Sequence, residues 1–315
     1  MTETEPSNPN LESHSNHRAG YVAVVGKPNV GKSTLVNALV GHKVAIVSTK
    51  PQTTRRRIMG ILTRDDAQIL FVDTPGFHEP KHALNKYMMR EVDGALADCD
   101  AILFVVDLSQ PPHDEDRLVA EHIRQFAQPK LMALNKADLV DPARVGEHIR
   151  QYLDLLGGEG AFPFMLTSGT VIKQQNLDEL LAMLVAALPE GPEFYPPDQY
   201  TDQPEKVLAA ELIREQAMRF LEQEVPHAVA VAGEDYKERP NNTMYVAATV
   251  YVERDSQKGN LIGKGGQVLK RIGMEARREI EKMLGFKVYL ELWVKVRPAW
   301  RRDEADVSEL LGGNQ

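Results

Sequence analysis

The feature that most constrains this chain is a glycine-rich stretch near its beginning, between an apolar run at Tyr21 to Val25 and a helical pattern at Thr34 to Val40. The stretch reads Gly26, Lys27, Pro28, Asn29, Val30, Gly31, Lys32 and Ser33. A strand, a glycine-rich turn and a helix in this order form a cradle for phosphate groups. Backbone N–H groups and the helix dipole favour anionic oxygens there, Lys32 adds a positive charge, and Ser33 offers a hydroxyl to Mg2+. The stretch therefore predicts a site for a nucleoside triphosphate and Mg2+.

The first half of the chain predicts an α/β domain around this site. Apolar runs that are typical of buried strands alternate with amphipathic stretches that are typical of helices. The further strands are expected at 69–72, 101–106, 130–134 and 162–166, and the further helices at 84–96, 114–126, 142–155 and 177–188. This alternation predicts a mixed, mostly parallel sheet with helices on both faces. Ligands of such folds bind beyond the carboxyl ends of the strands.

A second motif follows the expected strand at 69–72. It reads Asp73, Thr74, Pro75 and Gly76. Asp73 is placed to hold Mg2+ through water, and Gly76 lets its backbone N–H approach the γ-phosphate because no side chain intervenes. An Asp-x-x-Gly sequence is also common in ordinary turns, so its weight comes from its place after a strand.

A third motif follows the expected strand at 130–134 and predicts the base. It reads Asn135, Lys136, Ala137 and Asp138. The Asp138 carboxylate accepts hydrogen bonds from guanine N1 and its exocyclic amine, whereas adenine would leave that charge unpaired at a cost of at least ~1 to 3 kcal/mol. GTP is therefore favoured over ATP. Ser168, after the next strand, lies where a backbone amide would contact the base.

Composition excludes several classes of protein. The chain has 315 residues, which allows two domains with a core each, and its 43% hydrophobic content is ordinary for a globular protein. Cys99 is the only cysteine and no early apolar segment resembles a signal peptide, so a cytoplasmic location is expected. The longest apolar run, Leu180 to Leu188, is too short to span a bilayer. Any contact with the inner membrane would therefore be peripheral.

A proline-rich segment after the last expected helix of the first half divides the chain. The helical pattern resumes at 207–221, followed by expected strands at 228–231 and 244–252, two helices around 263–266 and a last strand at 286–296. This order is α-β-β-α-α-β. The expected parts are a flexible tail at 1–19, a nucleotide-binding domain at 20–189, a linker at 190–204, a second domain at 205–302 and an acidic tail at 303–315.

The second domain carries positive charge in an otherwise acidic chain. The net charge of the chain is −8, but residues 254–302 hold 13 basic and five acidic side chains. Such a bias suits either a solvated helix face or a polyanionic partner. A Gly-x-x-Gly loop at Gly263, Lys264, Gly265 and Gly266 lies within this basic region, between two helical patterns.

The ordered motifs resemble the TrmE-Era-EngA-like family of GTPases, and within it the Era subfamily, over residues 20 to about 302. Pro51 to Arg55 take the effector-loop position of the family, and the Gly-x-x-Gly loop resembles that of a type II KH domain, which grips about four nucleotides. The resemblance extends through 210–215 and 290–296. It departs from the family pattern at Thr167, Ser168 and Gly169, where Ser-Ala is usual.

This resemblance implies a GTP-switched assembly factor that binds the 3′ end of 16S rRNA in the small (30S) ribosomal subunit, as a monomer and without a DNA partner. Bound GTP would favour RNA binding, and hydrolysis to GDP would release it. Thr54 would join Ser33 and Asp73 at Mg2+, and the residues expected to support hydrolysis are Lys32, Thr54, Gly76 and Asn29. Thr34, Thr74 and Pro75 would complete the nucleotide site. The expected RNA contacts are Ile262, Gly263, Lys264, Gly265, Gly266, Lys270, Arg271 and Arg277.

The residue after Gly76 predicts slow intrinsic hydrolysis. Many GTPases have a glutamine there that orients the attacking water, and this chain has Phe77. A phenyl ring cannot position water. Related enzymes with asparagine in the Gly-x-Pro-Asn loop use K+, so Asn29 is a candidate ligand for that ion.

Two other functions and one decoy motif compete with this interpretation. A GTPase could instead drive another RNA process such as tRNA modification, with the second domain docking a protein. A nucleotide kinase would give no reason for the motif at 135–138. The sequence from His78 to His82 matches the zinc-protease pattern His-Glu-x-x-His, but Pro80 opposes the continuous helix that this pattern needs.

Overall fold

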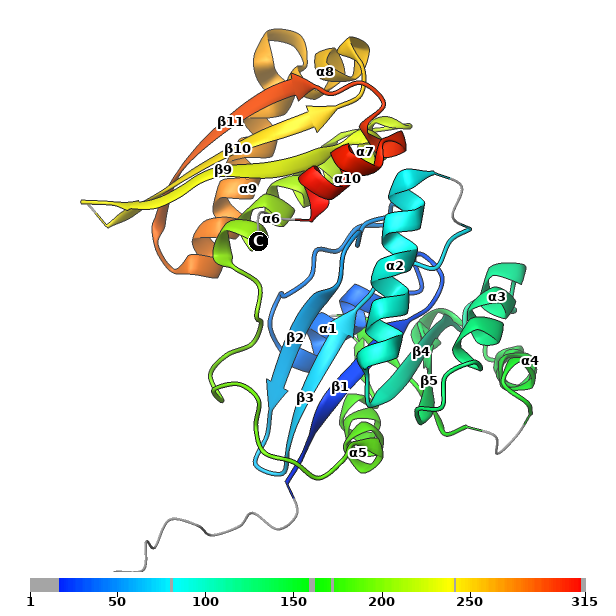
Figure 1. The fold of residues 1–315 in the computed structure, drawn as a ribbon. Coiled ribbons are helices and arrows are strands. Elements are labelled where there is room, and N and C mark those ends of the chain that lie inside the picture. The colour runs from blue at the N-terminus through cyan, green and yellow to red at the C-terminus, as the bar shows by residue number, and fades with distance from the viewer. Residues whose placement is uncertain (1–16, 80–81, 159–161, 171–172, 241, 313–315) are drawn as a thin grey trace, which may run out of the picture.

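The structure is a computed structural model that describes residues 17–79, 82–158, 162–170, 173–240 and 242–312 (Figure 1). Residues 1–16, which make up most of the expected tail, and Pro80 and Lys81 of the His-Glu-x-x-His stretch lie outside the described residues. Two units are seen, an α/β unit followed by an α+β unit, and the proline-rich segment joins them (Figure 1).

The first unit is built on a six-stranded sheet in the order β2-β3-β1-β4-β5-β6, and β2 alone among these strands runs antiparallel to its neighbour. The strands are β1 (Arg18–Val25), β2 (Ile58–Thr63), β3 (Ala67–Asp73), β4 (Ala101–Asp107), β5 (Lys130–Asn135) and β6 (Phe164–Leu166). The expectation of a mostly parallel sheet is confirmed. Edge strand β2 was not expected from the sequence, and it forms because the turn at 64–66 returns the chain along β3 as a hairpin.

Helices cover both faces of this sheet. Helices α1 (Lys32–Val40) and α5 (Leu177–Ala187) pack on the side that carries Val22 and Val24. Helices α2 (Ala83–Asp98), α3 (Asp114–Ile123) and α4 (Val145–Leu155) pack on the side that carries Ala23 and Val25. The alternate residues of β1 therefore enter two separate cores, as expected for a sheet buried on both faces.

The segment after β6 differs from the expectation. A short hairpin, β7 (Ser168–Thr170) and β8 (Lys173–Gln175), precedes α5 and was not predicted. Strand β7 packs against α1. The hairpin thereby places Ser168 beside the helix that follows the phosphate loop.

The proline-rich linker is docked on the first unit. The backbone N–H of Ile61 in β2 donates to the carbonyl of Tyr200 at 2.9 Å. The side chain of Gln68 accepts from the backbone N–H groups of Phe194 and Tyr195 at 2.7 and 3.0 Å. The linker is therefore hydrogen-bonded to edge strand β2 and to Gln68 of β3, and it packs on the first unit.

The second unit has the expected α-β-β-α-α-β order. Helix α6 (Glu205–Phe220) is followed by the short α7 (Val225–Ala228), β9 (Ala230–Arg239), β10 (Thr243–Val252), α8 (Asp255–Ile262), α9 (Gln267–Leu284) and β11 (Lys287–Val296). The sheet order is β11-β10-β9, with β11 parallel and β9 antiparallel to β10. Helices α6 and α9 cover one face, where Val246, Val250 and Ile272 lie in the core.

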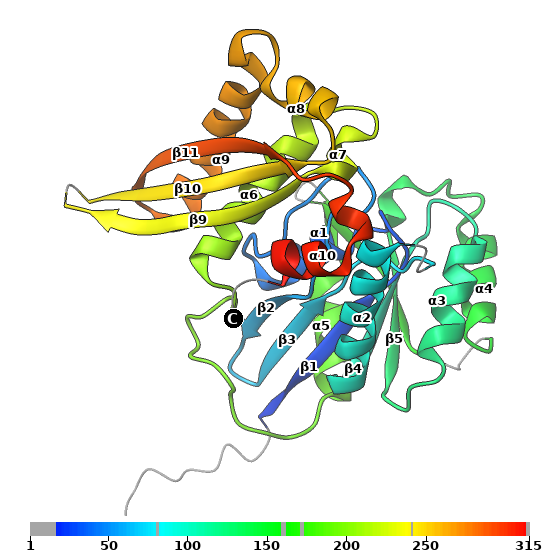
Figure 2. The same ribbon diagram turned by 45° about the horizontal axis from the view of Figure 1, so that its top comes forward.

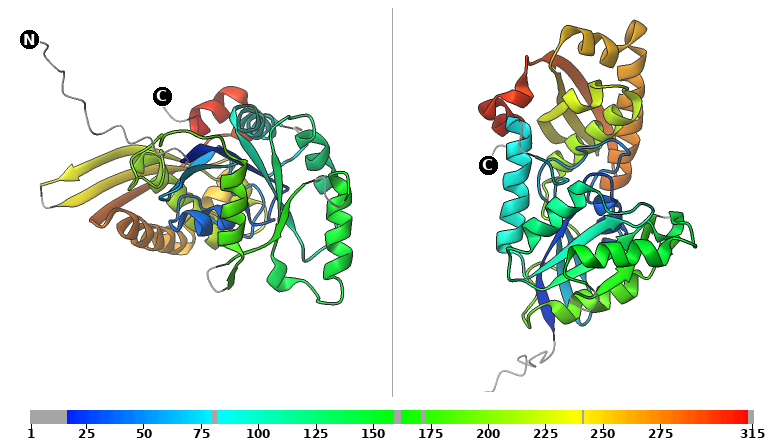
Figure 3. Two further views of the ribbon diagram at one scale, coloured as in Figure 1. Left: turned by 90° about the horizontal axis from the view of Figure 1, so that it is seen from below. Right: turned by 90° about the vertical axis from the view of Figure 1, so that its right-hand side faces the viewer.

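The described part of the expected acidic tail at 303–315 contains a packed helix. Residues Glu304–Leu311 form helix α10, which Asp303 caps by accepting from the backbone N–H of Asp306. Val307, Leu310 and Leu311 share one face and pack against Met88 of α2 and Trp300 of the short helix η3 (Trp300–Arg302). Figure 3 shows α10 beside the upper end of α2. The segment is acidic in composition, but its apolar residues recur at helical spacing and form one face of the helix. This apolar face is buried only when it packs against the first unit.

Across the described residues, the helices are too short or too polar to cross a bilayer.

The packing of α10 predicts a loss of stability when its apolar face is trimmed. Leu310→Ala should lower the free energy of unfolding by about 2 kcal/mol, since most of a buried apolar side chain is removed and a cavity remains. Urea unfolding of the full chain measures this change. Ser308→Ala, on the exposed face of the same helix, should stay within about 0.5 kcal/mol of the wild type. Equal effects of the two substitutions would show that α10 does not pack as described.

Candidate functional site

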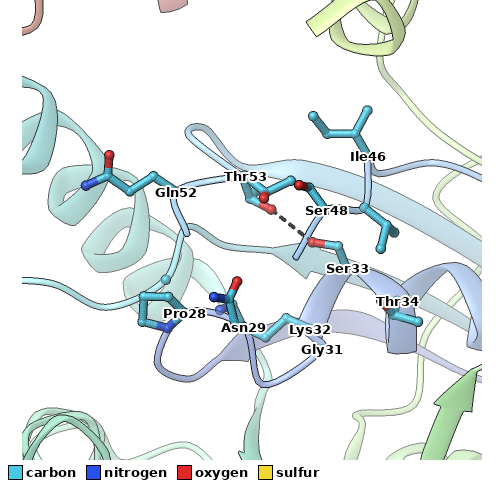
Figure 4. Close-up of a pocket in the computed structure, with 13 residues that line it drawn as sticks. Pro28, Asn29, Gly31, Lys32, Ser33, Thr34, Ile46, Ser48, Gln52 and Thr53 are labelled. Atoms are coloured by element: carbon cyan, nitrogen blue, oxygen red, sulfur yellow. Dashed lines mark hydrogen bonds between the residues drawn. The ribbon is translucent and has the colours of Figure 1, made fainter. Parts of the chain in front are cut away.

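The phosphate loop connects β1 to α1 and surrounds a buried ammonium group. Lys32 is only 6% exposed, and its Nζ donates to the carbonyls of Gly26 and Lys27, each at 3.1 Å. Burial lowers the pKa of Lys32 to about 8, although Asp73 opposes this shift. An anionic ligand would stabilise the charged form of the ammonium, which burial disfavours. The loop opens into a pocket of about 410 Å³, whose lining residues are drawn in Figure 4.

Three oxygens converge beside this pocket. The Ser33 hydroxyl donates to Asp73 Oδ2 at 2.6 Å, and the Thr54 hydroxyl lies 2.9 Å from Ser33 Oγ and 3.3 Å from the same carboxylate oxygen. The sequence motifs predicted Ser33 and Asp73 as Mg2+ ligands, and the family resemblance added Thr54. The fold brings the three together from α1, the loop before β2, and the end of β3.

The donor set of this cluster fits Mg2+, which prefers hydroxyl, carboxylate and water oxygens. Asp73 is fully buried, and its Oδ1 has no hydrogen-bond partner among the described residues. Burial raises the pKa of Asp73 to about 6, against the opposing effects of Lys32, Ser33 and Thr54. A divalent cation would compensate a carboxylate that is otherwise costly to keep charged in this place.

Gly76 lies against the phosphate loop. A Cβ at this position would come within 2.8 Å of Cγ of Pro28 and 2.9 Å of its Cα, so only glycine fits here. The next residue, Phe77, donates its backbone N–H to the carbonyl of Gly26 at 3.2 Å. The ring of Phe77 packs against the core on the α3 side, with its centroid 5.1 Å from the ring of His122. The ring therefore points into the protein and brings no polar group to the pocket.

The third motif lies at the carboxyl end of β5, next to the phosphate loop. The side-chain amide of Asn135 donates to the carbonyl of Val30 at 2.8 Å and ties the two loops together. Lys136 takes a left-handed backbone conformation with φ of 59°, and its ammonium pairs with Asp107 at 2.6 Å. Oδ1 of Asp138 is buried and has no hydrogen-bond partner within the part of the chain that the structure describes. This orphaned carboxylate oxygen suits the guanine donors that the sequence predicted.

Thr167 and Ser168 complete this side of the site. The carbonyl of Thr167 accepts from the backbone N–H of Ala137 at 3.1 Å, which positions the third motif. Ser168 is buried at the start of β7. The predicted base side is therefore assembled from the ends of two neighbouring strands.

One predicted loop residue has a different partner from the expected phosphates. The ammonium of Lys27 forms an ion pair with Asp116 of α3 at 2.7 Å, and both side chains are buried. Asp116 also accepts from the backbone N–H of His113 at 2.8 Å, at the start of α3. No local sequence pattern reveals this ion pair, because the two residues lie 89 positions apart. Among the described residues, no group of three or more His, Cys, Asp or Glu side chains is placed to hold a metal ion.

The Gly-x-x-Gly loop joins α8 to α9 as expected. Gly263, Gly265 and Gly266 have φ values of 72°, 60° and 79°, which side-chain-bearing residues rarely adopt. Lys264 and Lys270 are exposed beside the loop, whereas the guanidinium of Arg271 stacks 4.4 Å above the ring of Phe220. Ile262 is partly buried behind the loop, and Arg277 lies exposed two turns further along α9.

The loop from α1 to β2 connects the nucleotide site to the second unit, a role that the sequence did not reveal. Arg55 is 2% exposed and donates to the carbonyls of Val229 and His227 in the second unit, at 2.6 and 3.0 Å. Its guanidinium also lies 5.5 Å from the centroid of the Trp300 ring. Thr53 accepts a hydrogen bond from Arg214 of α6.

Two further contacts join the same loop to α6. Glu215 of α6 accepts from the ammonium of Lys43 at 2.6 Å and from the backbone N–H of Val47 at 2.9 Å. Ile46 belongs to the core cluster of the second unit. The segment that carries Thr54, which is predicted to ligate Mg2+, is thus held on both sides by the second unit.

This combination of sites defines a class of protein, a GTPase with a phosphate loop joined to a nucleic-acid-binding KH domain. Comparison with family models agrees: residues 21–136 match the family described as 50S ribosome-binding GTPase, and residues 224–301 match the KH domain. The first match covers the phosphate loop, the motif after β3 and the first two residues of the motif at 135–138.

Solved structures narrow the assignment. The chain is similar to Era in complex with MgGDPNP and nucleotides 1506–1542 of 16S ribosomal RNA, with 39% identity, a TM-score of 0.87, and coverage of 94% of this chain and 99% of that one. It is also similar to a single-substitution variant of Aquifex aeolicus Era bound to GDP·AlF4−, with 39% identity, a TM-score of 0.86, and coverage of 93% and 99%. This chain belongs to the Era family of GTPases.

The orphaned oxygen of Asp138 predicts a change in base preference. Asp138→Asn should weaken GTP binding about 100-fold, because two charge-assisted hydrogen bonds to guanine are lost. The same variant should gain affinity for xanthosine triphosphate, whose C2 carbonyl accepts from an amide. Titration with fluorescent nucleotides measures both affinities, and Asp141→Asn, three residues along the chain, serves as the control. An unchanged preference in Asp138→Asn would exclude this residue from base recognition.

Proposed function

We propose that this protein binds the 3′ end of 16S rRNA through its KH domain during assembly of the small ribosomal subunit, and that GTP controls this binding. The single observation that carries the proposal is the Era complex with both MgGDPNP and nucleotides 1506–1542 of 16S rRNA, which resembles this chain over nearly its whole length. The Gly-x-x-Gly loop with its exposed Lys264 supports an RNA partner over the alternative of a protein-docking module.

The nucleotide site supports the following division of roles. Lys32 neutralises β- and γ-phosphate oxygens, and the backbone N–H of Gly76 donates to the γ-phosphate. Ser33, Thr54 and Asp73 would hold Mg2+, Asp73 through water. When bound, Mg2+ stabilises the negative charge that develops on the phosphate oxygens. Thr54 belongs to the loop that contacts the KH domain, so it is the residue through which the nucleotide state would reach the second unit.

The proposed coupling follows from the neighbours of Thr54. Thr53 and Arg55 on either side of it contact Arg214, Val229 and His227 of the KH domain. A shift of Thr54 toward or away from a γ-phosphate must therefore move these contacts or break them. Bound GTP would favour one arrangement of the KH domain and GDP another, and RNA would in turn change nucleotide affinity by the same factor.

Hydrolysis is proposed to be slow without help, because Phe77 points into the core. We place a K+ ion at Asn29 as the compensating element. Asn29 lines the pocket, is exposed, and adopts a left-handed backbone conformation with φ of 63°. We propose a monomeric, cytoplasmic protein without a DNA partner, for which membrane contact would be peripheral.

The K+ proposal predicts that GTP hydrolysis is faster in potassium chloride than in sodium chloride at equal ionic strength. Asn29→Ala should lose this difference, since a monovalent cation would lose a side-chain oxygen ligand. Phosphate release under single-turnover conditions measures the rates. Equal rates in both salts for the wild type would remove K+ from the mechanism and leave the GTP site intact.

The coupling proposal predicts that RNA containing nucleotides 1506–1542 binds at least about fivefold more tightly in the presence of GDPNP than of GDP. In Arg55→Ala, the ratio of RNA affinities with GDPNP and with GDP should fall below about two, because the loop would then move without the KH domain. Fluorescence anisotropy of labelled RNA measures the affinities.

The neighbouring Arg57 offers a matched control, because its ionic partners, Glu91 and Asp98, lie in its own domain. Arg57→Ala should keep the wild-type ratio. Arg55→Lys retains the charge but loses the guanidinium fork, so it should behave like Arg55→Ala. A wild-type ratio in both Arg55 variants, with folding intact, would contradict the proposed route. Absence of RNA binding in either nucleotide state would contradict the function itself.

A further inference from the structure

The outer face of the KH sheet carries aromatic and cationic side chains that take part neither in the nucleotide site nor in the Gly-x-x-Gly loop. Residues with odd numbers on β10 and β11 point away from the core that α6 and α9 form, since the even-numbered Val246, Val250 and Leu292 face that core. Helix α10 covers the end of the outer face near Ala232 and Tyr251. The remaining part extends along the hairpin of β9 and β10, which projects away from the first unit (Figure 2).

Three aromatic rings lie on this open part. Tyr245 and Tyr289 are cross-strand neighbours whose rings stack with centroids 6.0 Å apart and an interplanar angle of 20°. Trp293 follows on the same face of β11, opposite Thr249. Tyr289 is 52% exposed and Trp293 is 41% exposed. Exposed aromatic rings in a row on one strand form an apolar patch that is unusual on a protein surface unless a partner covers it.

Cations surround the rings. The guanidinium of Arg239 lies 4.4 Å from the Tyr245 ring and 4.8 Å from the Tyr289 ring, and the ammonium of Lys237 lies 5.2 Å from the Tyr245 ring. Lys287 and Lys295 are exposed on the same face. The two acidic groups of this face are already engaged: Asp235 pairs with Lys237 at 2.5 Å, and Glu291 accepts from the Tyr245 hydroxyl at 2.8 Å.

We infer that this face, defined by Tyr245, Tyr289, Trp293, Arg239 and Lys295, is a second RNA surface that stacks unpaired bases next to those held at the Gly-x-x-Gly loop. This inference rests on the proposed RNA-binding function. Flat rings interleaved with cations suit nucleic acid, because bases stack on the rings while phosphates meet the cations. A neutral peptide would gain nothing from the excess of positive charge.

The surface lies on the strand that packs against the two helices flanking the Gly-x-x-Gly loop. Strand β11 is the edge strand of the sheet, and both α8 and α9, which flank the Gly-x-x-Gly loop, pack against it. An RNA chain that leaves the loop beside β11 therefore reaches Trp293 by crossing a single strand, a width of roughly 5 Å. The two exposed rings, Trp293 and Tyr289, are four residues apart on that strand, which is about 13 Å.

The test compares two RNAs with the full-length protein: a segment of about six nucleotides limited to the loop, and the longer segment of nucleotides 1506–1542. Trp293→Ala should weaken binding of the longer RNA about tenfold, because stacking on an aromatic ring is lost. Binding of the short RNA should change by less than about twofold. Trp293→Phe keeps a stacking surface and should restore most of the affinity.

Phe286→Ala is the matched control, since Phe286 is 48% exposed but lies at the opposite parity just before β11. It should leave both affinities unchanged. Tryptophan emission gives a direct readout, because Trp300 is fully buried and Trp293 is the other tryptophan of the chain. The longer RNA should quench this emission and the short RNA should not.

Equal losses for both RNAs in Trp293→Ala, or no loss for either, would overturn the second surface while the loop site stands. The second of these results would leave a protein partner as the occupant. Failure of both RNAs to bind the wild type would instead overturn the proposed function.

Discussion

The structure depends on how Thr54 is held between its two neighbours. Its hydroxyl lies within hydrogen-bonding distance of Ser33 and Asp73, whereas Thr53 and Arg55 contact the KH domain. The peptide backbone allows little slack over three residues, since consecutive Cα atoms are about 3.8 Å apart. The hydroxyl oxygen of Thr54 beside Asp73 and the interdomain contacts of Thr53 and Arg55 are thereby coupled by covalent geometry.

Arg55 illustrates the physical cost of such an arrangement. Burial lowers the pKa of its guanidinium well below the usual range, and the nearby charge of Arg214 adds to this effect. Two carbonyl acceptors and the face of Trp300 offset part of the desolvation. Burying such a charge is costly for stability, and the acceptors that offset this cost are present only while the KH domain lies in this position. Trp300 in turn packs with α10, so the C-terminal helix supports the same interface.

The two faces of the KH sheet have different roles. The inner face builds the core with α6 and α9, and the outer face is divided between α10 and an exposed row of rings. One strand, β11, therefore contributes to the core, borders the Gly-x-x-Gly loop region and presents Tyr289 and Trp293. Strict alternation of side chains along a strand makes this possible.

Local patterns in the sequence determined the class of the protein. The phosphate loop, Asp73 to Gly76 and Asn135 to Asp138 are short motifs at the ends of apolar runs, so their order predicted a GTP site and a mostly parallel sheet. The Gly-x-x-Gly loop between helical patterns predicted the KH domain for the same reason. Only the tertiary structure decided which polar residues are buried and where. The ion pair of Lys27 with Asp116, the burial of Arg55 and the packing of α10 each depend on residues far apart in the chain, whose proximity no local periodicity encodes.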